Sequence, residues 1–192
     1  MREIYLAGGC FWGLQEVFSR LPGVIATEVG YANSKQSAPS YEDVCTDETG
    51  AAETVKVTYD PQKIALTDIL DIFFAVIDPY SKNRQGNDIG SQYRTGVYYT
   101  DPVDEPMLEQ YFNRLRQRGQ ESATSRSEIM SHEEAVVLGG KKIQTELLPL
   151  ENFYTAEEEH QNYLKKHPQG YCHINLAALE RAGVITAAET KE

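Results

Sequence analysis

The stretch EIYLAGGCFWGLQEVFSRLPG, residues 3–23, predicts a strand, a tight turn and a helix in direct succession. Its first five residues form a largely apolar run that is typical of a buried strand. From residue 14 onward apolar side chains recur at helical spacing, and Pro22 and Gly23 then end the pattern. The apolar positions of this predicted helix are Leu14, Val17, Phe18 and Leu21.

The turn of this unit, GGCFWG at residues 8–13, holds the first cysteine and the only tryptophan among three glycines. Cys10 stands where the strand passes into the helix, so its thiol faces free N–H groups and the positive end of the peptide dipoles. This position favours the thiolate and predicts a nucleophilic cysteine with a lowered pKa. Phe11 and Trp12 are placed to wall an apolar pocket beside the sulfur. A buried, inert cysteine is the alternative at this point.

Strand and helix patterns continue along the chain and predict an α+β sandwich with helices against a largely antiparallel sheet. Strands are expected at residues 24–31, 53–60, 95–100 and 141–150, and helices at residues 66–77, 106–117 and 155–167. The last helix carries a capping-box pattern, Thr155 with Glu158. We expect residues 1–192 to form a single domain, with residues 176–192 as a tail or linker stub.

Composition excludes several classes of protein. The chain has 192 residues and a net charge of −11, which argues against a nucleic-acid partner. No apolar run reaches transmembrane length, and the N-terminus lacks the apolar core of a signal peptide. Three cysteines are too few for a disulfide scaffold, and the four histidines do not stand at metal-ligand spacing. We expect a soluble cytoplasmic protein, or one domain of a longer chain.

A carboxylate and a polar loop are further candidates for chemistry. Glu53 opens the alternating strand among small and apolar neighbours, so partial desolvation is expected to raise its pKa toward the range of a general acid. A solvated glutamate at a strand edge is the alternative. The glycine-rich loop at residues 83–96 is either a surface turn or a binding loop that carries Asp88 and Tyr93.

Taken together, these segments resemble the methionine sulfoxide reductase A family along most of the chain. The matching motifs are GGCFWG, PSYEDV, ETVKVTYDP, NRQGNDIGSQYRTGVYY and FYTAEEEHQNYLKKHPQGYC. The resemblance implies an α+β fold with a ferredoxin-like βαββαβ core and an irregular C-terminal segment. It also implies a peptide-methionine (S)-S-oxide reductase that acts on methionine sulfoxide in proteins, in peptides and as the free amino acid.

The resemblance assigns the reacting groups. Cys10 matches the nucleophile that attacks the sulfoxide sulfur, and Glu53 matches the acid that protonates its oxygen. Tyr41 and Tyr93 match tyrosines that hydrogen-bond the same oxygen. Cys172 matches the recycling cysteine, whose disulfide with the nucleophile thioredoxin is expected to reduce. This chemistry needs no metal and no organic cofactor.

The resemblance also assigns a binding pocket. Phe11 and Trp12 match the walls around the methyl group of the substrate. Asp88 matches a carboxylate that helps to bind the substrate main chain, and His160 matches a position in the structural or binding shell around the site.

Some features depart from the family or stay open. Ala51 stands where the family often has a histidine, which changes the surroundings of the acid. The stretch Ser122–Gly140 has no clear counterpart, and its role is open. Cys45 is a less favoured candidate for the resolving thiol than Cys172. Two other classes are alternatives: a non-catalytic binder of oxidised peptides, and a cysteine hydrolase or acyltransferase with Cys10 paired to a histidine.

Overall fold

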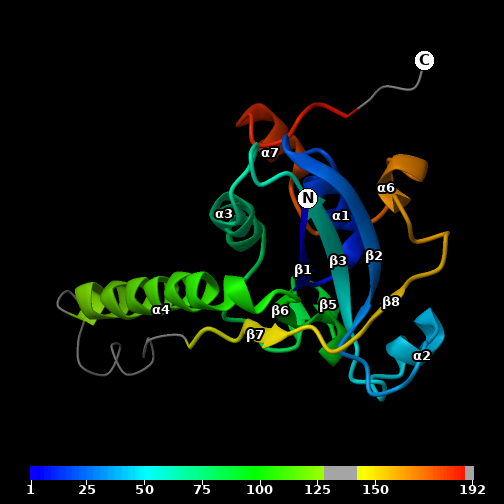
Figure 1. The fold of residues 1–192 in the computed structure, drawn as a ribbon, viewed down its shortest axis with the longest axis horizontal. Coiled ribbons are helices and arrows are strands. Elements are labelled where there is room, and N and C mark those ends of the chain that lie inside the picture. Colours follow the sequence, from blue (N-terminus) through cyan, green and yellow to red (C-terminus); the bar gives the residue numbers. More distant parts are fainter. Residues whose placement is uncertain (128–141, 189–192) are drawn as a thin grey trace.

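The computed structural model describes residues 1–127 and 142–188, and of residues 119–127 it describes only the helical backbone. These parts form an α+β fold around a six-stranded sheet in the order β7-β6-β1-β3-β2-β8 (Figure 1). The strands of the sheet are β1 (Arg2–Gly8), β2 (Val24–Ala32), β3 (Ala52–Tyr59), β6 (Thr95–Tyr99), β7 (Glu146–Pro149) and β8 (Phe153–Thr155).

Helices and short elements connect these strands. The α-helices are α1 (Phe11–Ser19), α2 (Tyr41–Cys45), α3 (Leu66–Val76), α4 (Glu105–Ser127), α6 (Tyr163–Lys166) and α7 (Leu176–Arg181). The short elements are the strands β4 (Arg84–Gln85) and β5 (Asp88–Ile89) and the 3₁₀ turns η1 (Ser91–Tyr93) and η2 (Pro102–Asp104). Figure 1 shows α4 extending away from the sheet.

Strand pairing confirms the predicted largely antiparallel sheet. Only β6 and β7 run parallel among the pairs of the described residues. In the register of the antiparallel strands, Leu6 lies opposite both Val55 and Val97, and Val55 lies opposite Val29. All four side chains are fully buried, so they form an apolar row across the middle of the sheet.

The main core lies on this face of the sheet, to which α1, α3 and the first part of α4 contribute buried side chains. Leu14 and Phe18 of α1 and Phe73 of α3 belong to the same buried cluster as the apolar row. The opposite face carries a smaller cluster, over which Leu150 and Phe153 pack. The residues of that smaller cluster are Tyr5, Ala7, Ala32, Ala52 and Tyr98.

The structure departs from the expected elements in the second half of the chain. The helix expected over residues 155–167 is wrong, because Thr155 ends β8 and only residues 163–166 are α-helical. Asn162, which precedes α6, has a left-handed backbone with φ of 52°. The helix expected at residues 106–117 continues to residue 127, and the rest of the stretch Ser122–Gly140 lies outside the described residues.

The segment from residue 176, expected to be a tail or linker stub, contains α7 and the buried side chain of Ile185. Among the described helices, none is both long enough and apolar enough to cross a membrane.

Phe73 provides a test of the core. Its side chain is fully buried, and its ring edge lies 3.0 Å from where a Cβ atom on Gly8 would stand. We expect Phe73→Ala to lower the free energy of unfolding by about 3–5 kcal/mol, because it removes buried area and leaves a cavity. Urea unfolding followed by circular dichroism measures this change. Ile25→Ala, at a side chain that is 53% exposed, serves as the control and is expected to change stability by less than about 0.5 kcal/mol. Equal losses in the two variants would contradict this packing.

Candidate active site

The candidate site lies where β1 passes into α1. Gly9 in this turn has φ of +83°, a backbone conformation that side-chain-bearing residues rarely adopt. A Cβ atom at Gly9 would also stand 2.6 Å from the Cβ of Gln85, so only glycine fits. The turn makes Cys10 the N-cap residue of α1, which is the position that the sequence predicted.

Cys10 lies in an environment that disfavours the thiolate. The residue is 8% exposed. Burial raises the pKa of its thiol most, and the nearby Glu53 carboxyl raises it further. The backbone N–H of Trp12 opposes this rise by hydrogen bonding to the sulfur. The expectation of a lowered pKa for Cys10 is therefore wrong, because burial outweighs the helix N-terminus.

Glu53 lies beneath the turn on β3, an internal strand between β1 and β2. It is 1% exposed, and its Oε2 accepts a hydrogen bond of 3.1 Å from the backbone N–H of Phe11. Burial raises the pKa of Glu53 to about 8, with a further rise from Asp88 and an opposing effect of the Phe11 N–H. The predicted rise is confirmed, the solvated strand-edge alternative is wrong, and at neutral pH the carboxyl group holds a proton.

Tyr41 and Tyr93 approach the carboxyl group of Glu53 from two separate short helical elements. Tyr41 begins α2 directly after Ser40, which caps this helix, and Tyr93 ends η1. Burial and then the charge of Glu53 raise the pKa of both phenols above the ordinary value of 10, and Cys10 contributes to the rise at Tyr93. Both phenols therefore stay protonated and available as hydrogen-bond donors.

Aromatic rings surround His160 on the other side of the turn. The ring of Phe11, which is 1% exposed, lies 5.7 Å from the imidazole, and the ring of Tyr41 lies 4.5 Å from it. Trp12 donates its indole N–H to Nδ1 of His160 at 3.3 Å. Trp12 also stacks on Tyr163 with ring centroids 3.8 Å apart. The structure thus joins Phe11, Trp12 and His160, as predicted, and adds Tyr163, which the sequence analysis did not single out.

Long-range hydrogen bonds explain why residues 155–161 are not helical. The carboxylate of Glu157 accepts bonds of 2.8 Å from the hydroxyl of Tyr31 and from the backbone N–H of Tyr41. The amide of Gln161 bonds both backbone groups of Val29 in β2. These side chains therefore connect β2 and α2 to the aromatic cluster. Their polar and acidic character suited a solvated helix face equally well, so local pattern did not reveal this role.

Asp88 and the segment around Cys172 also lie near the turn that carries Cys10. The hydroxyl of Tyr171 donates to Oδ2 of Asp88 at 3.2 Å, and Nδ1 of His173 lies 4.0 Å from the same oxygen. The ring of His173 also approaches the turn, 3.3 Å from where a Cβ atom on Gly9 would stand. The segment 171–173 therefore crosses between the loop of Asp88 and the turn that carries Cys10.

Cys172 itself contacts the first turn of α1. A Cβ atom on Gly13 would stand 2.9 Å from its Sγ, so the glycine provides the space in which this thiol sits. The thiol donates to the backbone oxygen of Ile174 at 3.3 Å. Cys45 is exposed at the end of α2, and all three cysteines are free thiols. The fold thus brings Cys172 to the helix that begins at Cys10.

The two histidines near the site bear on the hydrolase alternative. The fold brings both His160 and His173 to the turn that carries Cys10. Nδ1 of His160 is bonded to Trp12, and the other three ring nitrogens of the two residues have no hydrogen-bond partner in the part of the chain that the structure describes. Neither imidazole is therefore bonded to the Cys10 thiol as a general base. Within residues 1–127 and 142–188, no group of three or more potential ligands could hold a metal ion.

Comparison with known proteins places this geometry in a family. The chain matches the family model described as peptide methionine sulfoxide reductase over residues 2–191. It is 52% identical to the peptide methionine sulfoxide reductase MsrA of Clostridium perfringens (strain ATCC 13124) over 176 residues. That alignment covers 92% of this chain and 99% of the relative.

Solved structures agree with this match. Reduced Mxr1 from Saccharomyces cerevisiae has a TM-score of 0.74 and 35% identity, over 89% of this chain and 88% of that chain. Methionine sulfoxide reductase A of Corynebacterium diphtheriae has a TM-score of 0.74 and 35% identity, over 90% of this chain and 77% of that chain. Mxr1 has also been solved in complex with Trx2, and that chain shares the fold at 23% identity with a TM-score of 0.52.

The family model spans nearly the whole sequence, and the Clostridium perfringens relative shares more than half of the aligned residues. The chain therefore belongs to the peptide methionine sulfoxide reductase family.

Proposed function

We propose that this protein is a thioredoxin-dependent peptide-methionine (S)-S-oxide reductase. Its substrates are oxidised methionine residues in proteins and peptides, and free methionine sulfoxide. The observation that carries the proposal is the buried, protonated Glu53, held by the N–H of Phe11 directly beside the N-cap cysteine of α1. A general acid next to a thiol suits a reaction in which sulfur attacks and oxygen must be protonated.

In the first half of the reaction, the sulfur of Cys10 attacks the sulfoxide sulfur, and the sulfur–oxygen bond of the substrate breaks as its oxygen is protonated. The oxygen ends on the sulfur of Cys10, and methionine leaves. The balance is Cys10–SH plus methionine sulfoxide, which gives Cys10–SOH plus methionine. Cys10 is oxidised and the substrate is reduced. Because burial raises the pKa of the Cys10 thiol, the thiol proton must leave as the sulfur attacks.

The oxygen of the substrate acquires negative charge as its bond to sulfur breaks, so proton donors are required around it. Glu53 holds its proton up to a pH of about 8 and serves as the general acid. Tyr41 and Tyr93, whose phenols stay protonated, donate hydrogen bonds to the same oxygen. Phe11 and Trp12 form the apolar wall for the methyl group, while Asp88 and His160 contact the substrate around it.

In the second half, the thiol of Cys172 condenses with the sulfenic acid. The balance is Cys10–SOH plus Cys172–SH, which gives the Cys10–Cys172 disulfide plus water. Thioredoxin then reduces this disulfide by thiol–disulfide exchange. The contact of Cys172 with the first turn of α1 supports this assignment. The complex that yeast Mxr1 forms with Trx2 also supports it.

The same proposal includes the finer architecture and the cellular location. The order β6-β1-β3-β2 of four antiparallel strands, with α1 and α3 as their crossovers, supports a ferredoxin-like βαββαβ core. The buried Ile185 supports a single domain that includes the segment after residue 176. The small number of free cysteines supports a reducing compartment such as the cytoplasm.

The stereochemical course tests the proposed function. Wild-type protein with thioredoxin should convert the S epimer of methionine sulfoxide to methionine and leave the R epimer nearly unchanged. In the R epimer, oxygen and methyl exchange places, so the oxygen faces the apolar wall without a hydrogen-bond donor. Chromatography of methionine from the separated epimers measures this, with Cys10→Ser as the inactive control. Equal rates on both epimers, or activity in Cys10→Ser, would contradict the assignment.

Glu53→Gln tests the general acid. The variant keeps the shape of the side chain but has no proton to transfer, so the first turnover should slow by about 10²–10⁴-fold near neutral pH. Wild-type Glu53 loses its proton as the pH rises through about 8. The ratio of the wild-type rate to the variant rate should therefore be constant at lower pH and should fall above that value. Rapid-quench kinetics across this pH range measures both rates, and a ratio that is independent of pH would assign the proton to another donor.

Cys172→Ser separates the two halves of the reaction. The variant should release one equivalent of methionine and then stop, because Cys10 remains as the sulfenic acid when no thiol can condense with it. Trapping with dimedone followed by mass spectrometry should locate the adduct on Cys10 in the variant and little of it in the wild type. Cys45→Ser is the matched control and should cycle normally with thioredoxin. Full cycling of Cys172→Ser that ends only when Cys45 is also removed would identify Cys45 as the resolving thiol.

A further inference from the structure

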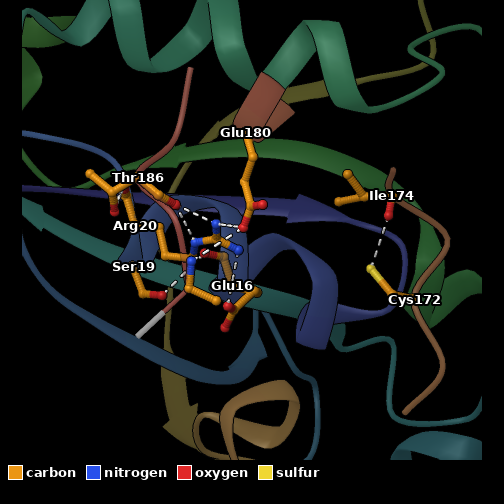
Figure 2. Close-up of polar contacts among 8 residues, drawn as sticks. Glu16, Ser19, Arg20, Cys172, Ile174, Glu180 and Thr186 are labelled. Carbon is orange, nitrogen blue, oxygen red and sulfur yellow. Dashed lines mark hydrogen bonds and ion pairs between the residues drawn. The ribbon is translucent and has the colours of Figure 1, made fainter. Parts of the chain in front are cut away.

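A buried ionic cluster ties the end of α1 to the segment that follows Cys172. Arg20, the C-cap residue of α1, is 8% exposed. Its guanidinium contacts the carboxylates of Glu16 on α1 and Glu180 on α7 and the backbone oxygen of Thr186, where its Nε lies 2.8 Å away (Figure 2). The backbone oxygen of Arg20 in turn accepts from the N–H of Thr186 at 3.0 Å.

Helix α1 carries Cys10 and part of this cluster, and it also contacts Cys172. Cys10 caps the N-terminus of α1, Gly13 contacts the sulfur of Cys172, and Glu16 and Arg20 follow at intervals of three and four residues. Residues at these intervals lie on one face of a helix. The helix therefore holds the nucleophile at one end, the resolving thiol against its first turn, and the cluster at its other end.

The segment after Cys172 is attached to the core chiefly at its two ends. Ile174 and Ile185 are buried at its two ends, but α7 between them has no buried residue. A groove of about 710 Å³ runs beside this segment, and Cys172, Arg20 and Glu180 all line it. Leu176 and Leu179 of α7 and the nearby Val184 pack partly buried against the core. The contacts of Arg20 add hydrogen bonds between ionised groups, which are the stronger kind, and they join α7 and Thr186 directly to the end of α1.

We propose that Arg20 is a positioning residue for the recycling step: its contacts with Glu180 and Thr186 hold the segment of Cys172 against α1, within reach of the oxidised Cys10. The inference rests on the proposed function. The step is the condensation of Cys10–SOH with Cys172–SH to give the disulfide and water. Holding the second thiol near the first raises its effective concentration, so release of the segment should slow this step alone.

The test measures two rates in the absence of thioredoxin. Wild-type protein and variants react with an excess of the S epimer, and quenched samples are analysed for methionine and for the Cys10–Cys172 disulfide by mass spectrometry. In Arg20→Gln, release of the first methionine should stay within about twofold of wild type, while disulfide formation slows by about tenfold or more. Dimedone adducts on Cys10 should increase in parallel. Arg20→Lys, which keeps the charge but not the fork of donors, should recover part of the disulfide rate.

Two further variants make the result decisive. Glu180→Gln removes a partner on α7 while it leaves α1 intact, and it should slow disulfide formation in the same direction; it decides the question if Arg20→Gln does not fold. Arg2→Gln removes an ion pair with Asp104 at the far end of β1 and should change neither rate. Unchanged disulfide formation in Arg20→Gln and Glu180→Gln, or an equal fall in both rates, overturns the proposal. If wild-type protein releases no methionine, the proposed function fails and this inference fails with it.

Discussion

The hydrogen bond from the backbone N–H of Phe11 to the carboxyl group of Glu53 joins the first turn of α1 to an internal strand of the sheet. It uses one of the N–H groups that a helix leaves free at its start. It also stabilises the charged form of this carboxyl group and so opposes the rise in pKa that burial and Asp88 cause. The turn at Gly9 is required for this contact, because it brings the start of α1 over the end of β1.

Burial at this junction gives the site its protonation state. Both Cys10 and Glu53 have raised pKa values, chiefly because each is removed from water. The Glu53 carboxyl further raises the pKa of Cys10, and Asp88 further raises the pKa of Glu53. The site therefore holds a neutral thiol next to a neutral acid. In the reaction proposed above, a sulfoxide between them would meet both the attacking sulfur and the proton that its oxygen needs, without prior creation of a buried charge.

Helix α1 connects this junction to Cys172, the resolving thiol of the proposed reaction. Its N-terminus carries Cys10, Gly13 makes room for the sulfur of Cys172, and its C-cap Arg20 binds the segment beyond α7. A short rigid helix thus sets the separation between two thiols that are far apart in the sequence. The groove beside Cys172 lies along the same helix and leaves this thiol more accessible than Cys10.

The sequence by itself determined the elements whose pattern is local. The buried strand and helix around GGCFWG and the alternating strand that begins near Glu53 follow from apolar periodicity. Local sequence left the Glu53 carboxyl group either partly desolvated or solvated at a strand edge, and the tertiary structure decided that it is buried. The ordered motifs further indicated the family. Only the tertiary structure decided that residues 155–161 are not helical, because Glu157 and Gln161 bond to residues more than 100 positions away. It likewise decided the direction of the Cys10 pKa shift, the approach of His160 and His173 and the binding of Arg20 to Glu180, since burial and charge at a side chain depend on groups that the chain brings together only when it folds.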